Sequence, residues 1–356
     1  MNKKLLTVAI AGAMAAPMSA QAVKYKLSGQ VNRAIVFQDD GAQSDVRHVD
    51  SISSGTRIRL RGSEDLGNGM QAGFYWELQT SSNPSSAAFP DQNSDGNQNT
   101  NNIRQAHVWF SGNWGKLSMG QLDGAANGAV ESDLSGTGIT GASVFRSSFS
   151  GGMGWNFSGG GATGITHGST YSSYDGFSRY DGIRYDTPAL GPVVVSASIG
   201  NDNKWDVAAR VNTALGGGQI SGSVFYGEND QGGTFNTGVD NRWGASLSYL
   251  FAQGTSITGF YSQNETEAGL DSDSWGAMLG HKWGPHAVSI SYGVASDVFF
   301  TDFEDSGWTV NYVHSLKKAN AELYASFQHN ELDTPTGFGA VEDINLFLVG
   351  ARVKFD

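Results

Sequence analysis

The sequence predicts an all-β protein, a transmembrane antiparallel β-barrel. Three observations favour this fold class. Segments of about ten residues alternate apolar and polar positions, short and long connections alternate between these segments, and aromatic residues lie near the segment ends. Sixteen strands are predicted, and an even number is expected when both chain ends lie on one side of a membrane. The predicted strands cover 24–37, 54–63, 69–80, 101–111, 116–121, 179–187, 192–200, 204–215, 219–227, 240–251, 255–263, 273–283, 286–293, 306–316, 320–329 and 343–355.

The first 22 residues are typical of a signal peptide that is removed after export. Lys3 and Lys4 precede a short apolar run at residues 5–16, and the small-x-small pattern of a cleavage site follows at residues 20–22. We therefore expect the mature chain, residues 23–356, to begin at Val23. The apolar run is too short to span a bilayer, and no later stretch approaches the roughly 20 apolar residues that a transmembrane helix needs.

The composition limits the possible functions. Without Lys3 and Lys4 the chain has 20 basic and 34 acidic residues, a net charge of −14. Nucleic acid is therefore an unexpected partner, because phosphate binding needs clustered basic residues. The absence of cysteine excludes disulfides and thiolate metal sites. The seven histidines show no H-E-x-x-H spacing, so we expect neither an enzyme nor a bound cofactor or metal.

The alternation is clear enough to assign the two faces of individual strands. Residues 70–79 form an apolar face of Met70, Ala72, Phe74, Trp76 and Leu78. The other face is more polar and includes Glu77. The last predicted strand, at 343–355, places Phe347, Val349, Ala351, Val353 and Phe355 on one face.

A soluble β-sandwich would show the same alternation of apolar and polar residues. The strand lengths and the connections therefore have to distinguish a sandwich from a membrane barrel. Strands of soluble sheets usually have five or six residues, fewer than most of the segments here. Short turns, such as those at 112–115 and 216–218, alternate along the chain with longer polar loops, such as those at 228–239 and 330–342. This rhythm is typical of periplasmic turns and extracellular loops. A barrel of sixteen strands is wide enough for an aqueous channel.

One connection, residues 122–178, is far longer than the others. Loops of this length usually have a function or are disordered. It is rich in Gly, Ser and Thr, and its aromatic residues favour packing against other parts of the protein. These aromatics are Phe145, Phe149, Trp155, Phe157, Tyr171 and Tyr174. We expect the segment to fold into the lumen as a constriction loop.

Several segments carry a family resemblance. Residues 54–79, SGTRIRLRGSEDLGNGMQAGFYWELQ, resemble the second and third strands of trimeric general diffusion porins of Gram-negative outer membranes. Residues 102–105, 115–122 and 183–188 are similar to the segments that flank the third loop in those porins. The resemblance implies an outer-membrane homotrimer in contact with lipid and lipopolysaccharide. Each sixteen-stranded barrel would pass small hydrophilic solutes and ions through its own pore, narrowed by the third loop.

Strand parity predicts a basic strip in the lumen. Ile58 and Leu60 must face lipid, so the three arginines between and beside them, Arg57, Arg59 and Arg61, face inward. An arginine that faces lipid costs about 2–4 kcal/mol at mid-depth. A solvated strand face of a soluble protein is the alternative. The porin resemblance assigns Arg57 and also Arg104 to the constriction.

Acidic candidates accompany the basic strip. Arg184 and Asp186 share the lumen face of the sixth predicted strand, and Glu77 faces the lumen on the third. The long loop contributes Glu131 and Asp133, with Asp123 at its start. Alternatively, Glu131 and Asp133 belong to a solvated loop surface without a role in the pore.

Opposed charges in a narrow aperture orient dipolar solutes and water, which favours hydrophilic solutes over apolar ones, and charged rings set ion preference. The sequence does not decide the sign of this preference, and a mild preference for cations is our expectation at this stage. The net charge of −14 favours cations at the pore mouths, whereas the lumen arginines favour anions at the narrowest point.

Two alternatives to a general diffusion porin remain at this stage. A substrate-specific channel on the same barrel would use the aromatic residues of the long loop, and a barrel enzyme or adhesin would act through its outer loops.

The segment Asp91–Asn102 matches the first half of a calcium loop. Asn102, however, stands where such a loop needs a bidentate glutamate, so a polar extracellular loop is favoured over a calcium site.

Overall fold

The computed structural model describes residues 23–90, 100–141, 146–201, 203–229, 239–267 and 269–356. The predicted signal peptide, most of the candidate calcium loop (91–99) and Phe145 lie outside the described residues.

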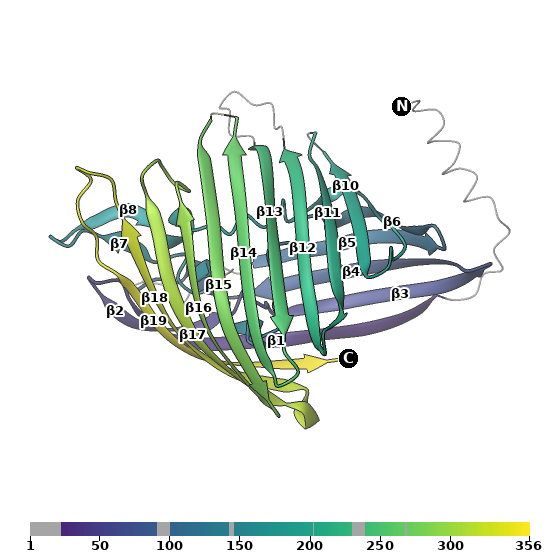
Figure 1. The fold of residues 1–356 in the computed structure, drawn as a ribbon. Coiled ribbons are helices and arrows are strands. Elements are labelled where there is room, and N and C mark those ends of the chain that lie inside the picture. The colour runs from purple at the N-terminus through teal and green to yellow at the C-terminus, as the bar shows by residue number, and fades with distance from the viewer. Residues whose placement is uncertain (1–22, 91–99, 142–145, 202, 230–238, 268) are drawn as a thin grey trace.

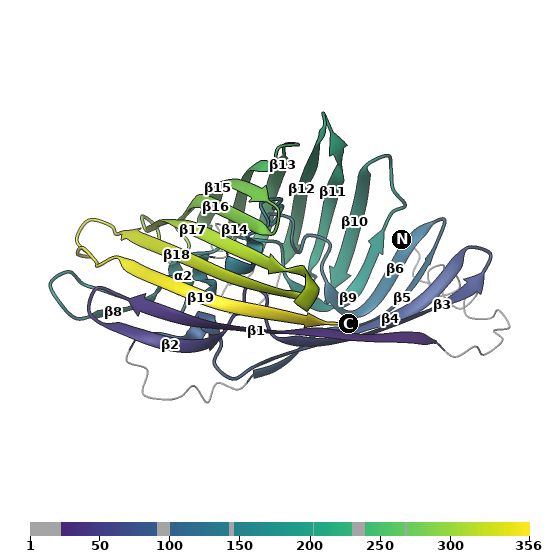
Figure 2. The same ribbon diagram turned by 90° about the horizontal axis from the view of Figure 1, so that it is seen from below.

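In the described part of the chain, seventeen strands form a single antiparallel sheet that closes on itself through pairing of its first and last strands (Figure 1). Figure 2 shows β19 lying beside β1 where the sheet closes. The strands are β1 (Lys24–Asp39), β2 (Ser44–Asp50), β3 (Arg57–Gly67), β4 (Met70–Ser81), β5 (Thr100–Gly112), β6 (Gly115–Asp123), β9 (Arg179–Asp186), β10 (Val193–Gly200), β11 (Trp205–Leu215), β12 (Gly218–Asn229), β13 (Val239–Leu250), β14 (Thr255–Thr266), β15 (Asp271–Trp283), β16 (His286–Ser296), β17 (Glu304–Leu316), β18 (Ala321–Asp333) and β19 (Ile344–Phe355).

The seventeen strands occupy sixteen positions around the barrel. Residues 24–30 of β1 pair with β3, and residues 33–39 of β1 pair with β2 on the same side. The strands β2 and β3 therefore share one position, which confirms the predicted sixteen-stranded barrel. The short strand β2 was not predicted, because its sequence, SDVRHVD, is mostly polar and gives only a weak alternation.

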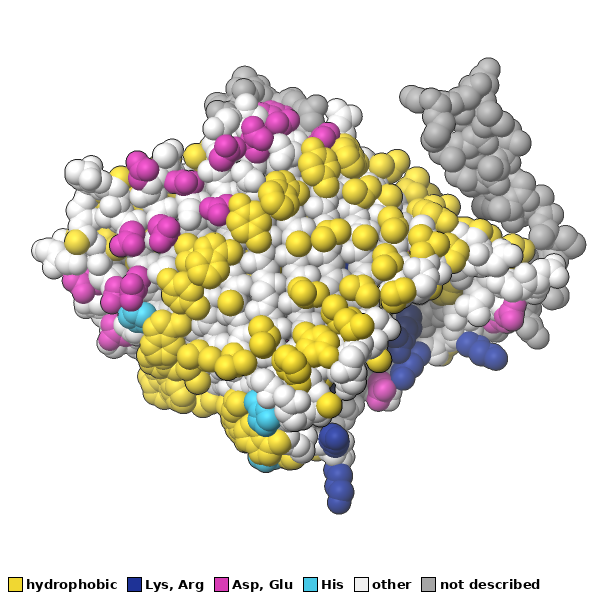
Figure 3. Space-filling view, in the orientation of Figure 1, with side chains coloured by type: hydrophobic (Ala, Val, Ile, Leu, Met, Phe, Trp, Pro, Cys, Tyr) yellow, Lys and Arg dark blue, Asp and Glu magenta, His cyan; other side chains and the backbone are white. Residues whose placement is uncertain are grey.

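The outer face is a band of exposed apolar side chains between two rows of aromatic rings. One row lies toward the long loops and contains cross-strand pairs such as Trp243–Tyr261 and Trp275–Tyr292. The other row lies at the end with the short turns and includes Trp283. Figure 3 shows the hydrophobic band, with acidic side chains gathered toward one end. Such girdles flank the lipid-facing band of membrane barrels.

The other described elements are short. Within the long loop lie the 3₁₀ helices η2 (Gly138–Thr140) and η3 (Arg146–Ser148), the hairpin β7 (Gly154–Asn156) with β8 (Ala162–Thr166), and helix α2 (His167–Thr170). The remaining 3₁₀ helices are η1 (Ser85–Ala87) and η4 (Lys317–Ala319). Within the described residues, no helix combines the length and apolar character that crossing a membrane requires.

The described parts of the long loop, residues 124–141 and 146–178, form two hydrophobic contacts with the inner wall of the barrel. Phe149 and Trp155 are fully buried in a cluster that includes Val36 of β1 and Leu346 of β19. A second cluster packs Ala126, Ala129 and Val130 of the loop against inward side chains of β11, β12 and β14. Burial of apolar area at about 25 cal/mol per Å² holds the loop on the wall.

Candidate functional site

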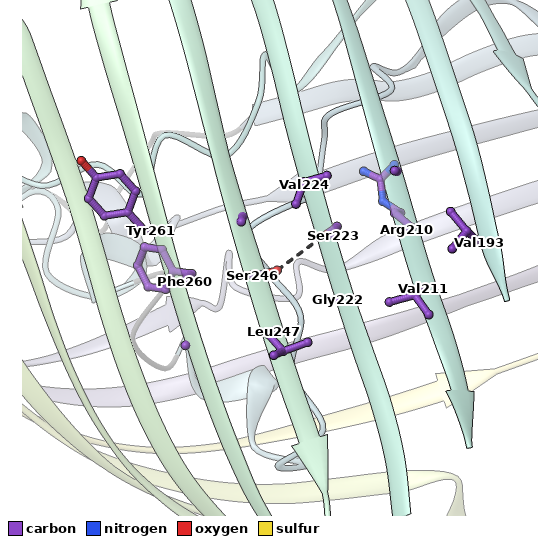
Figure 4. A pocket seen from close by; sticks show the side chains of 13 residues that line it. Val193, Arg210, Val211, Gly222, Ser223, Val224, Ser246, Leu247, Phe260 and Tyr261 are labelled. Carbon is purple, nitrogen blue, oxygen red and sulfur yellow. Dashed lines mark hydrogen bonds between the residues drawn. The ribbon is translucent and has the colours of Figure 1, made fainter. Parts of the chain in front are cut away.

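Small polar side chains on the inner wall hold the backbone of the first part of the loop. Inward positions of β12 and β13 carry serines, because the alternation turns their apolar neighbours outward. The carbonyl of Ala129 accepts hydrogen bonds from Ser223 Oγ and, at 2.7 Å, from Ser246 Oγ. The amide of Leu134 donates to Ser248 Oγ at 3.0 Å. Figure 4 shows Ser223 and Ser246 hydrogen-bonded to each other across neighbouring strands, with Arg210 nearby.

Three arginines on the same wall donate to carbonyl groups of the loop. Arg184 Nη1 donates to the carbonyls of residues 123 and 124, at 3.2 and 3.1 Å. Arg210 donates to Ala125 O at 2.6 Å and to Asn127 O at 2.8 Å. Arg242 donates to the carbonyl of Gly176 near the loop's end. The loop is thus attached at both of its ends by charge-assisted hydrogen bonds.

On strands β3 to β5, three guanidinium groups converge on one carboxylate. Glu77 is buried and accepts from Arg104 Nε at 2.6 Å and from Arg57 Nη1 at 3.4 Å. It also pairs with Arg59 Nε and accepts from the hydroxyl of Tyr75 at 3.0 Å. Three positive charges therefore face one negative charge, which leaves an excess of two positive charges at this point of the wall.

A β-bulge directs Arg104 into the lumen. Val108 and Phe110 of β5 are exposed on the outer face, and strict alternation from them would turn Arg104 outward as well. The pairing of β4 with β5 shifts register here: Glu77 is opposite Gln105, and Leu78 is opposite Ile103. The extra residue lets both Arg104 and Gln105 point inward, a common effect of a bulge.

The remaining predicted residues of the wall form two separate ion pairs. Asp123 Oδ1 lies 2.7 Å from Arg179 Nε, and Asp123 Oδ2 accepts from Gln105 at 2.9 Å. Asp186 pairs with Arg184 at 2.8 Å. Arg61 is exposed and lies on the same strand face as Arg57 and Arg59, nearer the short-turn end, opposite Lys26 in register.

The loop carboxylates are occupied by local partners. Asp175 accepts from the amides of Gly128 at 2.7 Å and Val130 at 3.0 Å. Glu131 is half-buried, and this burial, together with the negative charge of nearby Asp175, raises its pKa to about 9. Its carboxyl group is therefore neutral at pH 7. Asp133 Oδ1 accepts from the amide of Ser135 within the loop at 2.6 Å.

The sequence reasoning missed several lumen arginines, among them Arg179, Arg210 and Arg242. Strand parity could have placed Arg210 and Arg242 in the lumen, because Ala209 and Trp243 beside them point outward. Their hydrogen-bond partners are backbone carbonyls of the loop, which no side-chain pattern indicates.

These features define a class of protein. A closed sixteen-position barrel with an apolar outer band and a charged inner wall is a membrane channel, and a barrel of this size leaves room for water.

The family follows from comparison with known proteins. The sequence profile of a family described as Gram-negative porin matches residues 6–335, so the chain belongs to that family. The chain is 29% identical to outer membrane porin protein 32 of Delftia acidovorans, over 92% of this chain and 88% of the relative.

Solved structures share the fold. An anion-selective porin from Comamonas acidovorans matches with a TM-score of 0.64 and 21% identity, covering 94% of this chain and all of the other. OmpT of Vibrio cholerae in a trimer form matches with a TM-score of 0.58 and 14% identity, covering 94% of this chain and 100% of the other. The protein is an outer-membrane porin whose channel serves passive diffusion of ions and small hydrophilic solutes.

Proposed function

We propose that this porin is a general diffusion channel whose narrowest part prefers anions. One observation carries the proposal: Arg57, Arg59 and Arg104 share the single carboxylate of Glu77. The constriction would lie between these arginines and the loop of residues 122–178. Fixed positive charge in a narrow, low-dielectric aperture attracts anions and repels cations.

The pairing and protonation of the other carboxylates near the pore also support a preference for anions. Asp123 and Asp186 are each paired with an arginine, so neither adds a free negative charge. Glu131 is neutral at pH 7 because its pKa is raised to about 9. Glu131 therefore offsets little of the arginine charge at pH 7, although the whole mature chain is acidic.

The aromatic residues of the loop support a general channel over a substrate-specific one. A binding track needs aromatic faces exposed to the lumen. Phe149, Trp155, Tyr171 and Tyr174 are all buried in packing contacts.

A salt-gradient reversal potential tests the proposal. Purified protein in a planar bilayer under a KCl gradient is expected to show stepwise conductance and a reversal potential of the sign set by chloride permeation. A potential of the opposite sign would reject the anion preference, and absence of conductance by a folded barrel would reject the diffusion pore. Block of the current by one sugar or amino acid, but not by others of similar size, would favour the substrate-specific channel.

We further propose a homotrimer in which the outer face of β1 to β3 lies at the subunit interface, while the remaining outer surface contacts lipid and lipopolysaccharide. Arg33 has the outward parity of its neighbours Val31 and Ile35, and it pairs with Asp50 at 2.7 Å. An arginine on a lipid-facing surface costs about 2–4 kcal/mol at mid-depth, so contact with a partner subunit is favoured. The similar OmpT structure described as a trimer form supports this assembly.

Native electrophoresis in mild detergent tests the assembly. The wild-type protein is expected to migrate as a trimer, and Arg33→Glu is expected to shift it toward the monomer, because a second negative charge would then lie beside Asp50. A wild-type monomer, or a trimer that is unaffected by Arg33→Glu, would argue against the proposed interface.

A further inference from the structure

A group of metal-ligand side chains lies on the outer face of β18 and β19, at the end with the long loops. His329 and Glu331 are two residues apart on β18, so both point outward. Asp343 immediately precedes β19. Donor atoms of these three residues all lie within 4.8 Å of one another. His329 Nε2 is 2.7 Å from Glu331 Oε1 and 4.0 Å from Asp343 Oδ2.

The imidazole of His329 is oriented by a neighbour in the way that ligating histidines usually are. Its Nδ1 lies 2.8 Å from Asn345 Oδ1, the residue directly opposite it on β19. An amide oxygen only accepts, so Nδ1 carries the hydrogen and donates it. Nε2 lies 2.7 Å from Glu331 Oε1, where the protonated ring donates to the carboxylate, and loss of that proton frees the Nε2 lone pair for a metal ion. A metal-ligating histidine commonly donates its other N–H to such an oxygen.

The surroundings of His329 favour a cation. Residues 329–343 contain four carboxylates, at positions 331, 333, 342 and 343, and no Lys or Arg. A cavity of about 410 Å³ adjoins the group, and its walls include Glu331, Asp333 and Asp343. Both Glu331 and Asp343 are about half exposed, at 58% and 52%, so their side chains have room to close around an ion.

We propose that His329, Glu331 and Asp343 form a binding site for a divalent transition-metal ion of the Zn²⁺ class. One imidazole and two carboxylates match the nitrogen and oxygen ligands of such ions, with a fourth position left for water. Calcium is disfavoured, because it takes six to eight oxygen ligands and no imidazole. Asp343 moves toward the other two ligands when the ion binds.

The site would join two strands and thereby fix the last long loop, residues 334–343. That loop already contacts the β7–β8 hairpin: Glu342 N donates to Asn156 O at 2.8 Å, and Ser158 N donates to Ala340 O at 3.0 Å. The rings of Phe338 and Phe157 lie 5.4 Å apart. A metal ion held between β18 and Asp343 closes the base of this loop and holds it against the hairpin.

Zinc titration of the purified, folded full-length protein by calorimetry tests the site. We expect His329→Ala and Asp343→Asn each to weaken binding at one site by roughly tenfold or more. The matched control is His314→Ala. His286 and His314 have Nδ1 atoms 3.2 Å apart at the opposite aromatic row and could bind zinc themselves. The control is expected to leave the His329 site unchanged, and excess Ca²⁺ is not expected to displace the zinc.

The other outcomes overturn the proposal. Zinc binding that is absent in the wild type, unchanged in both His329→Ala and Asp343→Asn, or displaced by Ca²⁺ would show that the group is only a protonated histidine paired with carboxylates. A second measurement, chymotrypsin cleavage after Phe338, checks the loop. Zinc is expected to slow this cleavage in the wild type and not in His329→Ala, and equal rates in both would reject the closed loop.

Discussion

Arg104 Nε lies 2.6 Å from Glu77 Oε1, although strict alternation along β5 would direct Arg104 into the membrane. The β-bulge opposite residues 77 and 78 supplies the extra residue that turns it inward. Arg104 thereby becomes the third guanidinium on Glu77, beside Arg57 and Arg59 of β3, and adds a positive charge to the basic wall.

Replacing Arg104 tests whether this wall sets the ion preference. Arg104→Gln removes one of the three positive charges and is expected to shift the reversal potential toward cations. Arg57→Gln is expected to act in the same direction, because its guanidinium shares the same carboxylate. Arg104→Lys keeps the charge and is the control, with little expected change. If both glutamine variants leave the potential unaltered, the narrowest part of the pore lies elsewhere.

The basic wall around Glu77 also shows which features of the site can be predicted from the sequence alone and which cannot. Parity predicts an inward face for Arg57 and Arg59, which both contact Glu77 in the structure, because regular alternation is a local property of the chain. It would have misplaced Arg104, because a bulge depends on the pairing partner and leaves no periodic signal. The path of residues 124–178 was likewise not predictable, since carbonyl groups of the loop meet Arg210 and Arg242 from distant strands.

Removal of the shared carboxylate is expected to strengthen the anion preference and lower stability. Glu77→Gln leaves three neighbouring guanidiniums without a counter-charge. We expect a loss of about 1.5–3 kcal/mol in the free energy of unfolding, as for hydrogen bonds to charged groups. Denaturant unfolding and reversal potentials measure the two effects.

Glu322→Gln is the matched control for this change, because Glu322 also binds two basic residues, Arg352 and Lys354. Glu322 lies at the end of β18 with the short turns, far along the strand from the long loop that follows β18. A shift in ion preference as large as that of Glu77→Gln would mean that the charge of the whole lumen, and not the group around Glu77, sets selectivity.

The ion preference is expected to depend on pH through Glu131. Its pKa is raised to about 9, so the carboxyl group is neutral at pH 7 and becomes negative as the pH rises through 9. A new negative charge in the loop weakens the anion preference. Reversal potentials between pH 7 and pH 10 should therefore move toward cations. In Glu131→Gln this shift should be smaller, and an equal shift in that variant would assign the titration to other groups.

Arg210 is expected to keep the loop in place during conduction. It donates to the carbonyls of Ala125 and Asn127, and Arg210→Leu leaves both without this charged donor. We expect a loss of about 1.5–3 kcal/mol in unfolding free energy, together with noisier single-channel currents as the loop moves. Asn212→Ala is the control, since Asn212 lies on the same face of β11 and its side chain accepts from Gln219 near the short turns. Quiet currents in Arg210→Leu would mean that the hydrophobic contacts of Ala126, Ala129 and Val130 suffice to hold the loop.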